Sequence, residues 1–199
     1  MNNYKTIIEP FKSEILKIKK SKFIGCVYPV ETIEAIKAAM HQIKADHPSA
    51  SHWCYAYSYG IENPQIKTND DGEPSNSAGK PILGQIQAFD LSNVLVVVIR
   101  YYGGTKLGVG GLISAYKESA KLTLSSAEVV EKELTRGIIL KFKYDLLNVV
   151  MRAIKQYQLE IKDQTMEMDC SIKLEIPKRI FDEVLEKFQG VFGLKVKVL

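Results

Sequence analysis

The chain has 199 residues, of which 46% are hydrophobic and 25% are charged, as in ordinary globular proteins of one large or two small domains. No apolar run reaches the roughly 18 residues that a membrane-spanning helix needs, and the opening MNNYKTIIEPFK lacks the hydrophobic core of a signal peptide, so we expect a cytoplasmic protein without a membrane partner. The net charge of +4 is too small to predict nucleic-acid binding by itself, and the three cysteines lack the spacing of a zinc site.

The first elements are three strands and a helix. Turn signals and apolar alternation predict strands over residues 4–8, 13–18 and 23–30, and apolar spacing predicts a helix over residues 31–45 that ends at His47-Pro48. A group of lysines surrounds the turn between the second and third strands. Lysines there can contact phosphates, although such a run more often protects a strand edge from aggregation. These candidates are Lys17, Lys19, Lys20 and Lys22.

Residues 51–59 alternate as a half-buried strand does. One face carries Trp53 and three tyrosines, which can stack on nucleic-acid bases or pack in a core; we favour the core. The other face carries His52 and Cys54, which are near enough in sequence for a base and a nucleophile. A single cysteine among small residues is more often buried and inert.

An acidic segment follows, with the sequence TNDDGEPSNSAGKPILGQI over residues 68–86. It predicts a turn and then a helix that begins between residues 77 and 81, with Ser75, Asn76 or Ser77 as its cap. The clustered carboxylates can bind Mg²⁺, hold Arg100, or cap backbone amides; we favour a structural role without a metal. They are Asp70, Asp71 and Glu73.

The run VLVVVI over residues 94–99 predicts a central strand that is buried on both faces. A glycine-rich loop and then a helix follow it, and a helix start that is lined by glycines can bind an anion such as phosphate. The spacing matches neither a Walker motif nor G-x-G-x-x-G, so a tight turn with close packing remains equally open. The anion-site candidates are Arg100, Gly103, Gly104, Lys106, Gly108, Gly110 and Gly111, and Lys80 joins the lysines as a nucleic-acid candidate.

After a boundary near Leu134 the pattern changes to a smaller domain. Strands are predicted over residues 137–144, 159–166, 168–176 and 194–199, with one helix that Asp145 caps and another that Pro177 opens. This β-α-β-β-α-β order is that of a ferredoxin-like domain. We therefore expect domains at residues 1–134 and 135–199, the second suited to docking because it has no histidine and only scattered acidic residues.

Two long motifs, NDDGEPSNSAGKPIL and VVVIRYYGGTKLGVGGLISAY, together with the upstream His52, resemble the IMPACT family and its bacterial YigZ-type branch over the whole chain. Asn76-Ser77 stands where Gly-Thr is more usual, and Ser114 where an arginine is common. The resemblance implies an α+β protein. Its first domain would be a two-layer sandwich like those of a ribosomal protein and elongation factor G, and its second would be like the C-terminal domain of that factor. Eukaryotic members regulate translation by binding a protein that would otherwise activate a stress kinase.

These features lead to two functional hypotheses. The first is a non-enzymatic, cofactor-free regulator that binds RNA, the ribosome or a translation-associated protein. The second is a small enzyme that binds phosphate at the glycine loop, or a hydrolase or dipeptidase that uses His52 with Asp70, Asp71 and Glu73. A two-metal peptidase needs about five ligands, which one acidic cluster and one histidine do not supply. Both hypotheses predict a single groove in which Asp71, Glu73, Arg100 and Lys106 meet beside the helix start at Gly110, with His52 at its wall.

Overall fold

The computed structural model describes residues 2–199, which form two compact units of mixed helices and strands. The first unit is Tyr4–Lys132, and the second is Glu133–Leu199 with Asn2 and Asn3. The mixed α/β composition predicted from the sequence is confirmed. No helix within residues 2–199 is long and apolar enough to cross a membrane.

The first unit is built on one antiparallel sheet of six strands. Its elements are β1 (Asn3–Ile7), β2 (Phe11–Lys12), β3 (Leu16–Ile18), β4 (Ser21–Pro29), α1 (Ile33–Asp46), β5 (His52–Tyr59), β6 (Gln65–Asn69), α2 (Gly79–Ala88), β7 (Val94–Tyr101), α3 (Gly108–Ser126) and β8 (Val129–Glu133). The strand order is β2-β4-β7-β5-β6, with β3 also paired to β4, while β1 pairs separately with β8. As the apolar run predicts, β7 is central, and Val98 lies between Gly25 of β4 and Cys54 of β5.

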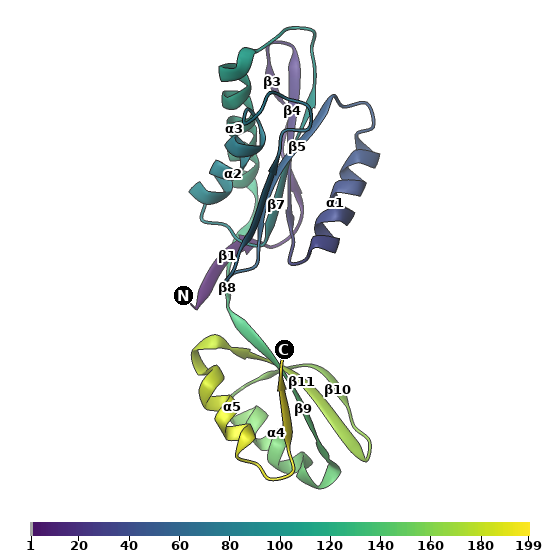
Figure 1. Ribbon diagram of the computed structural model, residues 1–199, viewed down its shortest axis with the longest axis vertical. Coiled ribbons are helices and arrows are strands. Elements are labelled where there is room, and N and C mark those ends of the chain that lie inside the picture. Colours follow the sequence, from purple (N-terminus) through teal and green to yellow (C-terminus); the bar gives the residue numbers. More distant parts are fainter. Residues whose placement is uncertain (1) are drawn as a thin grey trace. The chain divides into compact units, whose positions relative to one another are not determined.

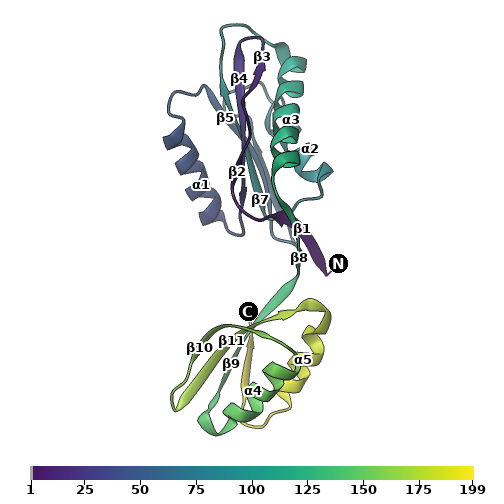
Figure 2. The ribbon, with the colours of Figure 1, turned by 180° about the vertical axis from the view of Figure 1, so that it is seen from behind.

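Helices cover both faces of this sheet (Figures 1 and 2). On one face, α2 and α3 enclose a cluster that includes Val96 and Val98 of β7, and on the other α1 covers Val97 and Ile99. The predicted two-layer arrangement is therefore wrong, because consecutive apolar residues of β7 supply a core to each face and make three layers. Tyr57 is 8% exposed in the α1 cluster, and the other three aromatic residues of this β5 row are partly buried against it, so the row packs on the core, as we favoured.

Several element boundaries differ from those predicted. Of the strand expected over residues 13–18 only β3 forms, because residues 13–15 separate it from β2; there the Ser13 backbone N–H donates to the carbonyl oxygen of Gly25. β6, which pairs with β5, was not predicted. It is an edge strand of mostly exposed residues, so its sequence lacks the apolar alternation that identifies a strand. Helix α1 begins after Thr32, whose hydroxyl accepts a hydrogen bond from the Ala35 backbone N–H.

The second unit has a four-stranded antiparallel sheet in the order β10-β11-β9-β12. Helices α4 and α5 pack on a core that includes Leu140, Ile172 and Phe181. Asp145 does not cap α4, because residues 144–146 form a short 3-10 turn before it. The elements are β9 (Thr135–Lys143), η1 (Tyr144–Leu146), α4 (Leu147–Gln156), β10 (Glu160–Thr165), β11 (Asp169–Pro177), η2 (Lys178–Ile180), α5 (Phe181–Gln189) and β12 (Lys195–Val198).

Candidate functional site

The carboxylate of Asp70 organises the start of α2. One of its oxygens accepts hydrogen bonds from the backbone N–H groups of Ala78 (2.9 Å) and Gly79 (2.8 Å), and the other accepts from that of Asn76 (2.9 Å). A helix start leaves such N–H groups without partners, and here a residue nine positions before Gly79 satisfies them. The structural alternative of an amide cap is therefore confirmed for Asp70.

The cap predicted from Ser75, Asn76 or Ser77 is wrong. The Ser77 hydroxyl donates instead to the carbonyl oxygen of Pro74 at 2.6 Å. The N-cap residue of α2 is Ala78, and it makes no side-chain hydrogen bond to the helix. Asn76 adopts a φ of 61°, a left-handed conformation that asparagine tolerates better than most residues. This explains how asparagine stands where glycine is more usual. Ser114 is exposed, and its hydroxyl donates to the Gly110 carbonyl oxygen.

Arg100 and Glu73 form a buried ion pair. Their side chains are each 5% exposed, and Nη1 of Arg100 lies 2.5 Å from Oε1 of Glu73. The Tyr116 hydroxyl donates to the same oxygen at 2.7 Å. The alternative in which an acidic residue holds Arg100 is thus confirmed. Because Glu73 neutralises Arg100 locally, the pair contributes little net charge to its surroundings.

Cys54 lies behind this pair and is not placed as a nucleophile. Its thiol donates to the Asp70 carbonyl oxygen at 3.0 Å and lies 3.3 Å from the Tyr116 hydroxyl. Burial raises the pKa of Cys54 to about 12, so the thiol stays protonated at neutral pH. The expected burial of Cys54 is confirmed, and its low reactivity stays a prediction; these contacts do not support the pairing of Cys54 with His52 as nucleophile and base.

His52 is oriented by the backbone. Its Nδ1 lies 2.8 Å from the carbonyl oxygen of Asp71, which can only accept, so Nδ1 carries the proton. Its Nε2 lies 3.8 Å from Oε1 of Glu73. The side chain of Asp71 accepts a hydrogen bond from the Trp53 backbone N–H at 2.7 Å. The prediction that Asp71 lies in the groove is wrong: φ values of 41° at Asp71 and 87° at Gly72 turn the chain so that its carboxylate caps β5 instead.

A pocket of about 500 Å³ opens where the strand and helix ends meet. It brings together five of the predicted residues, which are separated by up to 56 positions in sequence: His52, Glu73, Arg100, Lys106 and Gly108. Its lining leaves out the predicted residues Asp70, Asp71 and the glycines 103, 104, 110 and 111. Helix α3 begins at Gly108, two residues before the predicted start at Gly110. The lining residues are His52, Glu73, Pro74, Arg100, Tyr102, Lys106, Leu107, Gly108, Val109 and Leu112.

The start of α3 forms one wall of the pocket. Its N-cap residue, Leu107, makes no side-chain cap, and the first turn has no acidic residue. Gly108 has a φ of 75°, which glycine adopts without strain. The first N–H groups of this 19-residue helix therefore lack a side-chain cap at the pocket, where the helix dipole favours an anion. The side chain of Arg100 lines the same pocket, and its buried Nε has no hydrogen-bond partner among the described residues.

The lysine-rich turn packs against the glycine loop. Lys19 and Lys20 form the tip between β3 and β4, and a Cβ placed on Gly103 would lie only 2.1 Å from the Lys20 backbone. The Ser21 hydroxyl accepts from the Gly103 N–H and from Nη2 of Arg100, both at 3.3 Å. Gly103 is therefore a close-packing glycine, and the turn adjoins the loop that leads to the pocket.

The remaining basic candidates are exposed but differ in position. Lys17 and Lys22 face each other across the β3–β4 hairpin, next to the tip. Lys80 lies in the first turn of α2 and is outside the pocket lining. Lys106 is exposed and lines the pocket. Of these lysines, Lys106 is thus the one placed beside the α3 start.

The acidic cluster does not form a metal centre in the part of the chain described. Within residues 2–199 no group of three or more His, Cys, Asp or Glu side chains is arranged to hold a metal ion. The carboxylates of Asp70 and Asp71 accept backbone N–H groups, and Glu73 accepts from Arg100 and Tyr116. Hydrogen bonds from the protein itself thus already engage each of these three carboxylates.

Five pocket residues were not predicted as site residues, and two of them, Tyr102 and Val109, are large exposed side chains. Tyr102 is 47% exposed, and the Arg100 guanidinium lies 5.3 Å from the centre of its ring. Val109 is 53% exposed in the first turn of α3. An exposed aromatic residue beside an arginine and an apolar residue inside a glycine loop were the available signals, but each is common on surfaces without function.

Comparison with known proteins identifies the family. A family model described as the Impact N-terminal domain matches residues 19–124, which is more than half of the chain. The chain belongs to the IMPACT family. An IMPACT family member of Haemophilus influenzae is 36% identical over 183 residues, which span 87% of each chain. The IMPACT family member YigZ of Escherichia coli is 32% identical over 163 residues, covering 81% of this chain and 80% of YigZ.

A solved structure extends the similarity to the whole fold. It is described as the crystal structure of a hypothetical protein, and it matches 100% of this IMPACT family chain and 98% of its own with a TM-score of 0.77 at 28% identity. The resemblance expected from the two motifs is therefore confirmed. The family model covers Glu73, Arg100, Lys106 and Gly108, so the pocket lies within the Impact N-terminal domain.

Proposed function

We propose that this IMPACT family member is a non-enzymatic, translation-linked regulator whose first unit binds RNA through phosphates at the pocket beside α3. The observation that carries the proposal is the start of α3, which lacks a side-chain cap and lies beside the exposed Lys106 in one pocket. Translation is the process that family membership implies. RNA is the partner whose charge best fits the pocket.

The local charges favour an anion over a cation. Glu73 is already neutralised by Arg100, so Lys106 and the positive end of the α3 dipole make the electrostatic potential of the pocket positive. The turn carrying Lys19 and Lys20 adjoins the glycine loop and adds positive charge along one side. A polyanion that bound Lys106 could thus contact several lysines of the same unit.

The pocket lining also suits more than a bare ion. Leu112 and Val109 provide apolar walls, and the ring of Tyr102 is half exposed. Aromatic side chains stack on bases without sequence preference, while cations contact the backbone. A nucleotide of an RNA chain would match this combination, with its phosphate at Gly108 and its base toward Tyr102.

The domain arrangement that accompanies this proposal has a boundary at residues 134–135. The second unit would be a ferredoxin-like domain similar to the C-terminal domain of elongation factor G. Its support is the element order β9-α4-β10-β11-α5-β12, combined with the sheet order β10-β11-β9-β12. Such a domain would serve as a docking module of the protein.

The experiment is fluorescence anisotropy with labelled tRNA and a ribosomal RNA fragment at several salt concentrations. Removing one lysine that binds a phosphate should lower the slope of log K against log salt by about 0.7 to 0.9. We expect Lys106→Ala to lower the slope by about this amount, and Val109→Glu to weaken binding strongly because its carboxylate would compete for the α3 start. Val109→Gln is the matched neutral control. Salt-insensitive binding, or equal effects of Glu and Gln, would contradict the proposal.

A second candidate is an enzyme that acts on a small phosphate-bearing ligand. The observation that favours it is His52, whose protonated Nδ1 is fixed by the Asp71 carbonyl oxygen while the ring lines the pocket. This is the arrangement of a general base. Thermal melting with a panel of nucleotides and sugar phosphates tests it, because a ligand of the folded state raises the melting temperature. A shift with turnover that His52→Gln abolishes would favour the enzyme.

A further inference from the structure

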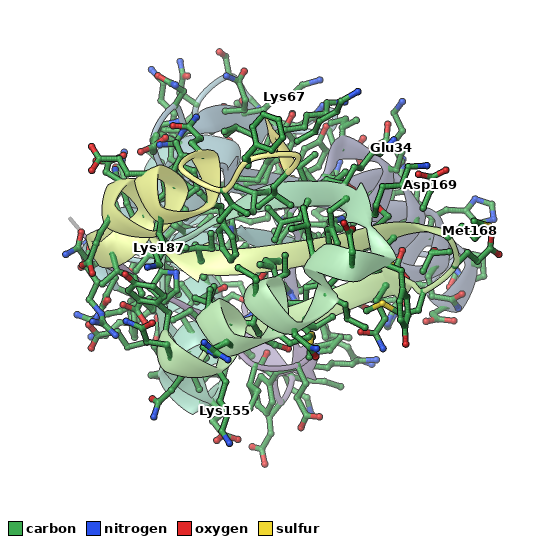
Figure 3. The ribbon with its side chains drawn as sticks, turned by 90° about the horizontal axis from the view of Figure 1, so that it is seen from below. Glu34, Lys67, Lys155, Met168, Asp169 and Lys187 are labelled. Carbon is green, nitrogen blue, oxygen red and sulfur yellow. The ribbon has the colours of Figure 1, made fainter. Side chains whose placement is uncertain are left out.

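Three large apolar side chains are exposed at one end of the sheet in the second unit. Phe192 is 98% exposed, Met168 is 85% exposed and Tyr144 is 62% exposed. Tyr144 directly follows β9, Met168 directly precedes β11, and Phe192 lies in the loop before β12. Figure 3 labels Met168 beside Asp169. Single exposed apolar residues are common, but a group of them marks a binding surface.

The strand register places these residues at the same end. Lys143 pairs with Asp169, so Tyr144 and Met168 continue from neighbouring positions of β9 and β11. The loop after Phe192 returns to this end, because a Cβ on Gly193 would lie 3.4 Å from the Leu146 side chain of η1. Segments that are nearly 50 residues apart in sequence thus meet around one corner of the sheet.

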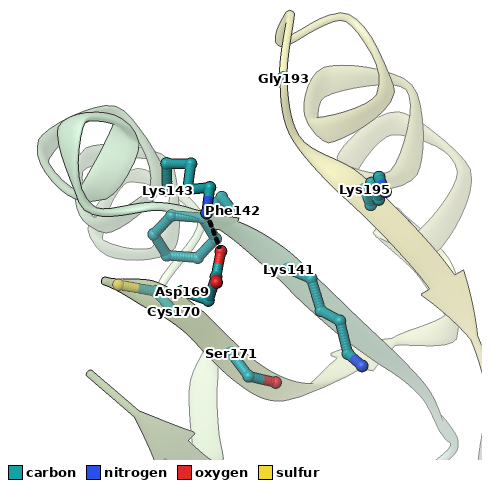
Figure 4. Close-up of a pocket in the computed structure, with 8 residues that line it drawn as sticks. All are labelled: Lys141, Phe142, Lys143, Asp169, Cys170, Ser171, Gly193 and Lys195. Atoms are coloured by element: carbon teal, nitrogen blue, oxygen red, sulfur yellow. Dashed lines mark ion pairs between the residues drawn. The ribbon is translucent and has the colours of Figure 1, made fainter. Parts of the chain in front are cut away.

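A hollow of about 430 Å³ lies at this corner (Figure 4). Lys143 and Asp169 form an ion pair at 2.6 Å and largely cancel each other's charge. Lys141 and Lys195 lie directly opposite on β9 and β12, and neither has an ion-pair partner among the described residues. Like charges in this position repel, and a bound anion would remove that repulsion. The lining residues are Lys141, Phe142, Lys143, Asp169, Cys170, Ser171, Gly193 and Lys195.

We propose that this corner, named here the lysine-aromatic rim and made of Lys141, Tyr144, Phe192 and Lys195, binds single-stranded RNA. Unstacked bases would lie on the exposed rings of Tyr144 and Phe192, and phosphates would contact the two lysines. Duplex RNA is a poorer fit, because its paired bases cannot stack on a protein ring. The inference rests on the RNA partner proposed above, but it uses none of the residues at the α3 pocket.

RNA is favoured over a protein partner by the charges. Lysine is depleted in the interior of protein interfaces, whereas single-stranded nucleic-acid sites combine basic and aromatic side chains. Lys197 lies on the same face of β12 as Lys195, two residues along, and extends the basic surface. Asp169 is the one acidic residue that lines the hollow, and Lys143 already pairs with it.

The test is fluorescence anisotropy of the full chain with labelled oligouridine and with a duplex RNA of equal length. Phe192→Ala should weaken oligouridine binding by about fivefold or more, since one stacked base contributes about that factor. It should change duplex binding much less. The Lys141→Gln, Lys195→Gln double variant should lower the salt slope by about 0.7 for each lysine. The almost complete exposure of Phe192 keeps these effects separate from folding.

Two sets of variants serve as controls. Lys155→Gln with Lys187→Gln removes the same charge from the helices of this unit, where Figure 3 labels both residues. Lys106→Ala reports on the α3 pocket alone. Equal reductions of the salt slope in the lysine variants of the rim and of the helices would contradict the rim proposal. Unchanged oligouridine binding in Phe192→Ala would contradict it as well. If Lys106→Ala has no effect while Phe192→Ala does, the pocket proposal fails and the rim stands.

Discussion

Replacing Glu73 by glutamine tests whether the buried ion pair is a structural centre of the first unit. The change keeps the shape of the side chain and an acceptor for Tyr116, but it leaves the charge of Arg100 without its partner. Both side chains are 5% exposed, so water cannot solvate the guanidinium. Breaking a buried pair in this way costs about 3 to 5 kcal/mol. We expect the free energy of unfolding of the first unit to fall by about that amount.

The assay is urea unfolding followed by the fluorescence of Trp53. Trp53 is the single tryptophan of the chain and lies in β5, so its signal reports on the first unit. The matched control is Asp90→Asn, which removes an exposed pair with Lys5 in the same unit, where the side chains are 50% and 76% exposed. An exposed pair contributes about 0 to 1 kcal/mol. Asn also tolerates the left-handed φ of 55° at position 90.

A second variant separates the charge from the packing. Glu73→Gln combined with Arg100→Met removes both charges and leaves an apolar chain of similar length between the rings of Phe23 and Tyr102. We expect it to recover part of the stability, because replacing both partners of a buried pair is far less costly than removing one. If Glu73→Gln and Asp90→Asn both lower the free energy of unfolding by less than 1 kcal/mol, the buried charge of Arg100 does not need Glu73 for stability.

Three further predictions concern the same unit. Cys54 should resist iodoacetamide in the folded protein at pH 8 and react after unfolding, because burial raises its pKa to about 12; fast alkylation of the native thiol would contradict this. Asp70→Ala should lower the free energy of unfolding by about 1 to 3 kcal/mol in the urea assay, since backbone donors at the α2 start lose their acceptor. Burial, then the nearby Lys12, lowers the pKa of His47 below 6.5. The unfolded chain therefore binds more protons below pH 6.5, stability falls as the pH drops through that window, and His47→Gln should remove that part of the dependence.

The central strand could be predicted from the sequence because its signal is local. Six consecutive apolar residues need partners on both sides, and β7 has them in two separate clusters. The end of α1 followed in the same way from apolar spacing and from His47-Pro48, whereas its start at Ile33 lies two residues after the predicted one. The three-layer arrangement was implied by that run, yet the family resemblance favoured two layers.

The site was less predictable because its contacts are distant in sequence. Which carboxylate reaches which partner depends on the left-handed turn at Asp71 and Gly72, and composition does not fix that turn. The packing of the Lys20 turn on Gly103 joins segments more than 80 residues apart. β6 carries no apolar alternation because it is an exposed edge strand. The chemical groups of the site could be predicted from the sequence, but which of them share a pocket depends on the conformations of these turns.

The proposed RNA contact can be tested most directly at the backbone of α3. We suggest titrating isotopically labelled full-length protein with a 12-nucleotide RNA and following the amide signals of Gly108, Gly110 and Gly111 by two-dimensional NMR. If a phosphate binds at the uncapped helix start, these amides should shift together and saturate with the anisotropy curve, and Val109→Glu should abolish the shifts. Binding of the RNA with these amides unmoved would contradict the proposed site.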